Sequence, residues 1–116
     1  MEPKEVDFEF PRGDTLPILF DFKDILGTNL TQLDEIYFTL KKNYNTEEYI
    51  LQKRLTRGEI EKVDNQFALE LSHTDTATLA YGNYVYDIQI KSGTYVRTAY
   101  KGQITLTEEA TFISNE

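Results

Sequence analysis

Residues 74–90 read TDTATLAYGNYVYDIQI, and this stretch decides the fold. Its polar beginning predicts a short helical turn capped by Asp75, because an aspartate carboxylate accepts hydrogen bonds from the exposed backbone N–H groups of a first turn. A spacing of the form LxxGxY follows. In a β-sandwich this spacing is typical of a tyrosine corner, which forms where the chain crosses from one sheet to the other. The expected structural corner consists of Asp75, Leu79, Gly82 and Tyr84.

A strand and a hairpin are predicted directly after this corner. Alternate residues of a strand share one face. The residues predicted to point inward are Tyr84, Tyr86, Ile88 and Ile90. The returning strand then presents Val96, Thr98 and Tyr100 to the same face, which requires a loop with an odd number of residues. A three-residue loop at 91–93 meets this condition and places Gly93 at the left-handed position that such loops use.

Alternation of apolar and polar residues recurs along the chain and predicts seven strands. They are residues 6–10, 16–23, 36–41, 49–55, 66–71, 84–90 and 96–106. Ile60 and Val63 indicate a further short pairing. No long stretch has helical periodicity, so the predicted fold is all-β, a seven-stranded antiparallel sandwich of the immunoglobulin/fibronectin type III kind with a tyrosine corner-like turn. A closed barrel is the alternative.

The length of 116 residues fits one domain. We expect a single β-sandwich domain at residues 1–107. Residues 108–116 are first acidic and then apolar at Phe112 and Ile113, which indicates a C-terminal tail or a docking segment.

The composition excludes several classes of site and partner. The chain has no cysteine, so it carries no disulfide, thiol nucleophile or cysteine-ligated metal. Its net charge of -8 opposes binding to nucleic acid, because that binding depends on Lys and Arg neutralising phosphates. The N-terminus has no apolar signal-peptide core, and no segment has the length of a membrane-spanning helix. We expect folding in a cytoplasm, with no membrane and no nucleic acid as partner.

Residues with catalytic or metal-binding chemistry form no complete constellation. His73 and Asp75 resemble half of a dyad, but no serine lies in a nucleophile-elbow pattern, and a lone histidine before a polar turn is more often solvated or capping. The carboxylate pairs at 47–48 and 108–109 consist of adjacent residues, which point to opposite faces of a strand and chelate poorly. We therefore expect no catalytic residue, no metal site and no cofactor.

Two surface features are candidates for contacts with partners. The tripeptide RGD at residues 12–14 matches the sequence that integrins recognise, although a glycine turn is expected there between two strands in any case. Tyr37, Tyr81 and Tyr95 are predicted to point outward. Exposed aromatic side chains contribute strongly to protein interfaces and to sugar stacking, so these three residues form the possible interface.

Three phrases of the sequence resemble a known family. They are RGDTLPILFDFKD at 12–24, IYFTLKK at 36–42 and HTDTATLAYGNYVYDIQIKSG at 73–93. Together they resemble the small immunoglobulin-like proteins encoded in the structural modules of tailed phages and prophages, and they are similar to the N-terminal domain of phage baseplate upper proteins. The resemblance extends over about residues 12–107 and includes a DTxxLxxGxYxYDI-like run at 75–88.

The resemblance implies a non-enzymatic building block of a virion, located in the tail, in the baseplate or on the head. Its partners would be other virion proteins, with a homo-oligomer in a symmetric assembly as a further expectation. Its location would be the virion, or the cytoplasm of the bacterial host before assembly. The alternative is a carbohydrate-binding or adhesion module in which the surface tyrosines act as stacking platforms.

Overall fold

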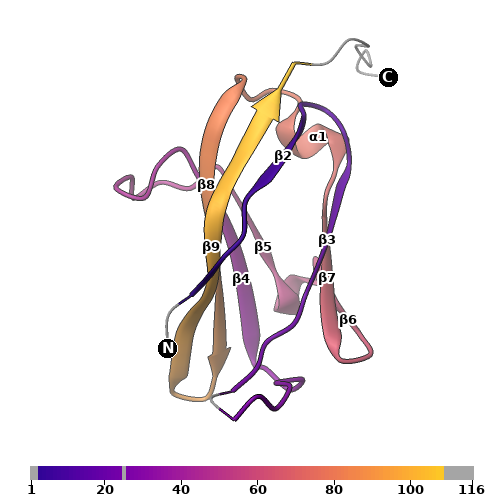
Figure 1. Cartoon of the computed structure of the whole chain (residues 1–116), viewed down its shortest axis with the longest axis vertical. Coiled ribbons are helices and arrows are strands. Elements are labelled where there is room, and N and C mark those ends of the chain that lie inside the picture. The colour runs from indigo at the N-terminus through magenta and orange to yellow at the C-terminus, as the bar shows by residue number, and fades with distance from the viewer. Residues whose placement is uncertain (1–2, 25, 109–116) are drawn as a thin grey trace.

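The computed structural model describes residues 3–24 and 26–108, which form two β-sheets packed as a sandwich (Figure 1). The strands are β1 (Lys4–Glu5), β2 (Phe8–Pro11), β3 (Leu16–Phe20), β4 (Glu35–Lys41), β5 (Leu51–Arg54), β6 (Ile60–Val63), β7 (Gln66–Leu71), β8 (Gly82–Ser92) and β9 (Tyr95–Thr107). A short 3-10 turn, η1 (Leu55–Arg57), follows β5, and a one-turn helix, α1 (His73–Thr76), follows β7.

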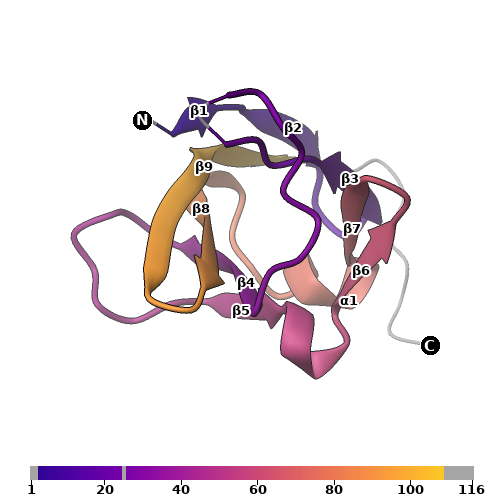
Figure 2. The ribbon, with the colours of Figure 1, turned by 90° about the horizontal axis from the view of Figure 1, so that it is seen from below.

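The two sheets differ in size. The larger sheet has the order β1-β9-β8-β4-β5, with β2 also paired to β9, and the smaller sheet has the order β3-β7-β6. Seen along the strands, β3, β7 and β6 lie on one side of the molecule, opposite β9, β8, β4 and β5 (Figure 2). The prediction of an all-β sandwich is confirmed.

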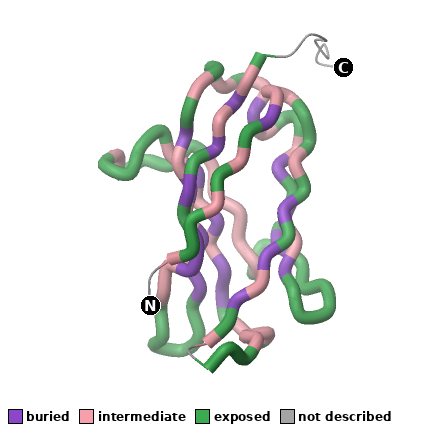
Figure 3. The backbone as a smooth tube through the Cα atoms, viewed as in Figure 1, coloured by how far each residue is buried: buried purple, intermediate pink, exposed green. Residues whose placement is uncertain are grey.

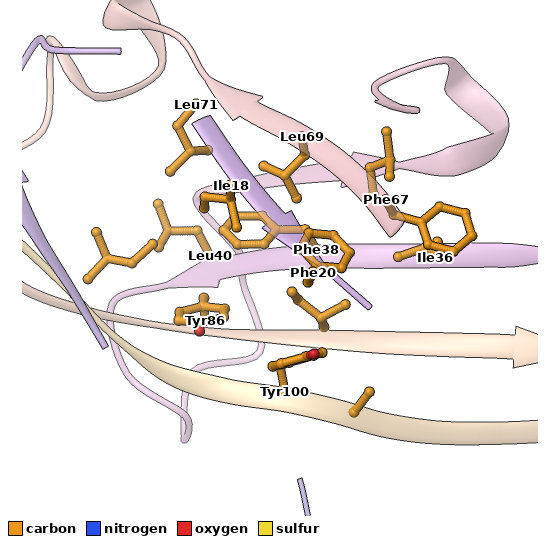
Figure 4. Close-up of a cluster of buried hydrophobic side chains, with 14 of the residues drawn as sticks. Ile18, Phe20, Ile36, Phe38, Leu40, Phe67, Leu69, Leu71, Tyr86 and Tyr100 are labelled. Carbon is orange, nitrogen blue, oxygen red and sulfur yellow. The ribbon is translucent and has the colours of Figure 1, made fainter. Parts of the chain in front are cut away.

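The core lies between the sheets and is built from alternate residues of each strand (Figure 3). The inward face predicted for β8 is confirmed, because Tyr84, Tyr86, Ile88 and Ile90 are all buried. Phe38 of β4 stacks on Tyr86 with ring centroids 5.4 Å apart. Figure 4 shows side chains of the smaller sheet pointing toward those of the larger one: Ile18, Phe20, Phe67, Leu69 and Leu71 face Phe38, Leu40, Tyr86 and Tyr100.

Several strand ends differ from the predictions. The strand expected at residues 49–55 is shorter, since β5 covers only Leu51–Arg54 before the chain tightens into η1. The short pairing expected at Ile60 and Val63 is the strand β6, which pairs antiparallel with β7. Apart from Glu108, the predicted C-terminal segment lies outside the described residues.

The prediction of a wholly antiparallel sandwich is wrong at the N-terminus. Both β1 and β2 pair with β9 in the parallel direction. The reason is that β2 belongs to the larger sheet and β3 to the smaller one, so the link at 12–15 crosses between the sheets. The first strand therefore pairs with the last strand and not with its neighbour in sequence.

The hairpin between β8 and β9 contains a bulge that the sequence analysis missed. Ile88 is paired with Tyr100, but Gln89 is paired with Thr98, so Ala99 is the extra residue. Ser92 pairs with Tyr95, which leaves a loop of two residues in place of the predicted three. The bulge adds one residue to β9, so the side chains between the bulge and the hairpin loop point to the opposite face from the one predicted.

This change of face corrects the predicted register. Tyr100 is buried as expected, but Val96 is 53% exposed. Arg97 pairs with the inward residue Ile90, and its Nη2 donates to the backbone carbonyl oxygen of Lys23 at 3.1 Å. The placement of Val96 and Thr98 on the inner face is therefore wrong.

Gly102 allows the N-terminal segment to cross β9 closely. A Cβ atom at Gly102 would lie 2.0 Å from the carbonyl oxygen of Val6. The same oxygen accepts a hydrogen bond of 2.6 Å from the Tyr86 hydroxyl, and the Val6 N–H donates to the Lys101 carbonyl at 3.0 Å. A glycine at this position is thus required by the close approach of two backbones.

We expect Gly102→Ala to lower the free energy of unfolding by about 1–3 kcal/mol, because the added methyl group forces Val6 away from β9. Urea unfolding measures the change. Lys101→Ala is the matched control, since Lys101 is exposed on the same strand and its replacement should change stability by less than about 0.5 kcal/mol. Equal stability of the two variants would contradict this role of Gly102.

Candidate functional site

The corner around Tyr84 is closed by contacts between residues that are near in sequence. Tyr84 is only 4% exposed, and its hydroxyl donates to the backbone carbonyl oxygen of Ala80 at 2.7 Å. Gly82, which lies between them, has a φ of 129°, a conformation that residues with a side chain rarely adopt. Leu79 packs against the core. These contacts set the direction in which the chain enters β8.

Asp75 belongs to the corner in a different role from the one predicted. Helix α1 begins after Ser72, which is its N-cap, so Asp75 lies inside the helix and does not precede it. The Asp75 carboxylate accepts from the Ser72 backbone N–H at 2.7 Å. Nζ of Lys53, on β5, lies 3.0 Å from the same carboxylate oxygen. The N-cap prediction is wrong because Ser72 and Asp75 have the three-residue spacing of a capping box, in which the acidic residue reaches back to the cap.

The RGD tripeptide is held against this corner. Nη1 of Arg12 donates to the Leu79 carbonyl oxygen at 3.1 Å, and the guanidinium lies 4.3 Å from the centroid of the Tyr81 ring. The Gly13 N–H donates to Oγ1 of Thr76 at 3.1 Å, and Thr76 is completely buried. The tripeptide therefore joins the N-terminal segment to α1 and the corner.

The three tyrosines of the possible interface are not brought together. Tyr81 directly precedes β8 and Tyr95 pairs with the last residue of β8. At a rise of about 3.3 Å per residue, the length of β8 separates them by about 36 Å. Tyr37 lies in the middle of β4, with the Arg54 guanidinium 4.8 Å from its ring centroid. Tyr37 and Tyr81 thus each have an arginine against the ring.

Tyr44, in the loop between β4 and β5, reaches back onto the larger sheet. Its hydroxyl lies 3.2 Å from the backbone carbonyl oxygens of both Tyr86 and Gly102. Burial raises the pKa of the Tyr44 phenol, and the nearby carboxylate of Asp87 adds to the effect. Burial likewise raises the pKa of Asp87. The segment between the strands predicted at 36–41 and 49–55 is therefore a loop whose aromatic residue covers the outer face of β8 and β9.

Glu35 is a buried carboxylate that the sequence analysis did not single out. It is 4% exposed, and Nη2 of Arg54 donates to its Oε2 at 2.8 Å. The Thr56 hydroxyl donates to the same oxygen at 2.5 Å, and the Thr56 N–H donates to Oε1 at 3.0 Å. Burial alone raises the pKa of Glu35, but the hydrogen bonds from Thr56, Ile36 and Arg54 outweigh it and hold the pKa at about 2. This carboxylate is ionised and fastens η1 to β4.

The sequence carries no local pattern that predicts this cluster, because its residues are far apart along the chain. Glu35 and Arg54 are 19 residues apart, and they approach because β4 pairs with β5 in the register that places Tyr37 opposite Arg54. A glutamate before an alternating strand otherwise has the pattern of a solvated residue.

Other candidate chemistry is used in structural contacts or is exposed. His73 is exposed at the first position of α1, and the carboxylate of Asp75 is held by Ser72 and Lys53. In the part of the chain that the structure describes, no group of three or more His, Asp or Glu residues is arranged to hold a metal ion. Among those same residues, no helix is long and apolar enough to cross a membrane.

Comparison with known proteins gives a structural likeness and no family. No family model matches the sequence, and no curated protein matches it. Among solved structures, the chain is similar to part of the endo-β-1,4-mannanase from Thermotoga petrophila, with a TM-score of 0.59 and 11% sequence identity. The match covers 93% of this chain and 18% of the mannanase chain. At this identity the likeness shows the fold alone, and the chain spans less than a fifth of the enzyme.

We expect Tyr84→Phe to lower the free energy of unfolding by about 1 kcal/mol, because it removes only the hydroxyl that donates to Ala80. Thermal or urea unfolding measures this loss. Tyr95→Phe is the control, since Tyr95 is exposed and close to the hairpin loop. If both variants unfold like the wild type, the hydrogen bond does not stabilise the corner.

The lowered pKa of Glu35 predicts how the stability of the protein depends on pH. Its folded-state pKa of about 2 lies below the ordinary value of 4.5, so its ionised form contributes on the order of 3 kcal/mol above pH 4.5. That contribution is lost as the pH falls from 4.5 through 2. The stability difference between the wild type and Glu35→Gln should therefore be largest at neutral pH and shrink across this window. Unfolding curves at a series of pH values test it, with Glu47→Gln, an exposed loop residue, as the control; a difference that does not vary with pH would exclude the proposed ionised cluster.

Proposed function

We propose that this protein is a non-enzymatic structural component of a phage or prophage virion, in the tail, in the baseplate or on the head, and that it acts through protein–protein contacts. The observation that carries the proposal is that the first and third phrases of the phage resemblance bind each other. Arg12 and Gly13 of the first phrase donate to Leu79 and Thr76 of the third. The two phrases are far apart in sequence but contact each other in the fold. Together they therefore support an architecture shared with the phage proteins better than either phrase does alone.

The strand order supports the finer assignment to an immunoglobulin/fibronectin type III-like fold. The order β3-β7-β6 corresponds to strands B, E and D, and the order β9-β8-β4-β5 corresponds to G, F, C and C′. Tyr84 lies near the start of β8, where the tyrosine corner of such domains lies on strand F. The N-terminal strand then lies beside strand G.

The use of the polar side chains supports a non-enzymatic role. Glu35 is saturated with hydrogen bonds and ionised. Asp75 binds Ser72 and Lys53, and therefore does not orient His73 as a base. A general acid or base needs a proton affinity near the working pH and an open position for a substrate, and neither carboxylate combines these properties.

Open strand edges offer sites for neighbours in an assembly. Among the described residues, β3 and β6 lie at the two ends of the smaller sheet, and β5 lies at one end of the larger sheet. An extended segment of another protein can add to such an edge. Because a virion repeats its contacts by symmetry, individually weak contacts add up to strong binding. The partners are then other virion proteins, and the location is the virion or the host cytoplasm before assembly.

A carbohydrate-binding module is the second candidate, and the exposed side chain of Tyr95 is the observation that favours it. On this reading the surface tyrosines stack on sugar rings. The arginines against Tyr37 and Tyr81 occupy ring surface that a sugar would need. Tyr95 remains as an exposed aromatic side chain at the hairpin end.

Copurification with the products of the flanking genes separates the two candidates. For the virion role we expect the chain to enter tail, baseplate or head particles and to associate with at least one flanking product in sedimentation over a concentration series. A strict monomer that binds none of them contradicts this role. Binding to an array of glycans that includes mannan oligosaccharides, abolished by Tyr95→Ala, would establish the carbohydrate module in its place.

A further inference from the structure

The outer face of the smaller sheet carries a groove with an apolar floor. Leu19, Ala68 and Glu61 lie side by side on β3, β7 and β6, and the next row pairs Pro17 with Glu70. Since Ile18 and Leu69, between these rows, are buried, the two rows face outward. The groove crosses all three strands and has a volume of 460 Å³. Leu19 is 61% exposed although it lies within β3.

The charge along this groove has one sign. The ionisable residues that line it are Glu59, Glu61 and Glu70, with no lysine or arginine among the described lining residues. Glu59 is paired with Arg57, whose Nε lies 3.0 Å from its carboxylate. Glu61 and Glu70 are exposed and have no salt-bridge partner among the residues that the structure describes. Their negative potential therefore extends into solvent.

The outer face of the larger sheet is different. There Asp87 lies opposite Lys101 on the neighbouring strand, and the positive charge of Lys41 also acts on Asp87. Mixed charges of this kind produce a weak net field, whereas a cleft lined by one sign attracts the opposite charge. The outer face of the smaller sheet is thus the one that attracts positively charged groups.

We propose that this groove is a docking site for a segment of a partner protein that presents lysine or arginine on both sides of an apolar side chain. The apolar side chain covers Leu19 and Ala68, and the flanking cations bind Glu61 and Glu70. An apolar contact removed from water with charges at its rim is the usual arrangement of a protein interface. The proposal rests on the proposed function, since it specifies one of the protein–protein contacts that the virion role requires.

The test uses the full chain labelled with ¹⁵N and a synthetic peptide in which lysine alternates with leucine, flanked by Gly-Ser. We expect the amide shifts of Leu19, Ala68 and Glu70 to move on titration, and the affinity to fall at higher ionic strength. The double variant Glu61→Lys, Glu70→Lys should lower the affinity by about tenfold or more. Leu19→Ser should weaken binding without any change of charge.

The matched control is the double variant Glu47→Lys, Glu48→Lys, which changes the net charge by the same amount. These residues lie in the loop between β4 and β5, which Figure 1 shows on the opposite side of the molecule from β6 and β7. The control should bind the lysine–leucine peptide as the wild type does. A peptide with serine in place of leucine should bind more weakly.

Four results would overturn the proposal. The first three are shift changes that map to another surface, equal losses in the two double variants, and equal binding of the serine and leucine peptides. Concentration-dependent self-association that Glu70→Lys abolishes, with no binding of the peptide, would instead assign the groove to a second copy of the chain and also overturn it.

The failure of this proposal differs from a failure of the virion role. If the chain enters particles and the Glu61→Lys, Glu70→Lys variant enters them equally well, the groove is not the docking site and the virion role stands. If the wild-type chain is absent from particles, the virion role fails whatever the peptide titration shows.

Discussion

The hydrogen bond from the Tyr84 hydroxyl to the Ala80 carbonyl oxygen is the constraint on which the rest of the structure depends. It fixes the path of the chain where it leaves α1 for β8, which is the strand between β9 and β4. Because strand register determines which residues are buried, an error in this entry angle would misplace the inward face of β8. The positive φ of Gly82 makes the path possible, and the contact of Leu79 with the core holds it in place.

The N-terminal segment is fastened to this corner and then to the last strand. Arg12 binds Leu79 and Tyr81, so the link from β2 to β3 cannot swing away from α1. Near the middle of β9, Gly102 lets the backbone of Val6 approach so closely that the Val6 carbonyl oxygen accepts a hydrogen bond from the Tyr86 hydroxyl. The first and last strands thereby pair in parallel. This pairing covers one edge of the larger sheet and leaves β3 at an open end of the smaller one.

The contrast between buried and exposed charged side chains indicates where binding is expected. Side chains that carry charge inside the fold, such as Glu35, are fully used by their neighbours and stabilise strand ends. Among the residues that the structure describes, the smaller sheet has three strands, and its outer face carries exposed glutamates around an apolar floor. The outer face of the smaller sheet is therefore the surface on which the proposed docking site lies.

The sequence by itself determined the features that depend on neighbours along the chain. The inward face of β8 follows from the period-two alternation of Tyr84 to Ile90, and the Tyr84–Ala80 contact joins residues four positions apart. Only the tertiary structure decided the features that join distant residues. The parallel pairing of β2 with β9, the partnership of Glu35 with Arg54 and the groove from Pro17 to Glu70 all depend on which strands become neighbours. The bulge at Ala99 also depends on distant residues. On either side of it, Arg97 donates to the carbonyl oxygen of Lys23 and Tyr100 donates to that of Asp21. Local patterns specify which residues a regular strand such as β8 buries, whereas bulges and the pairing between distant strands are decided by the packing of the whole sandwich.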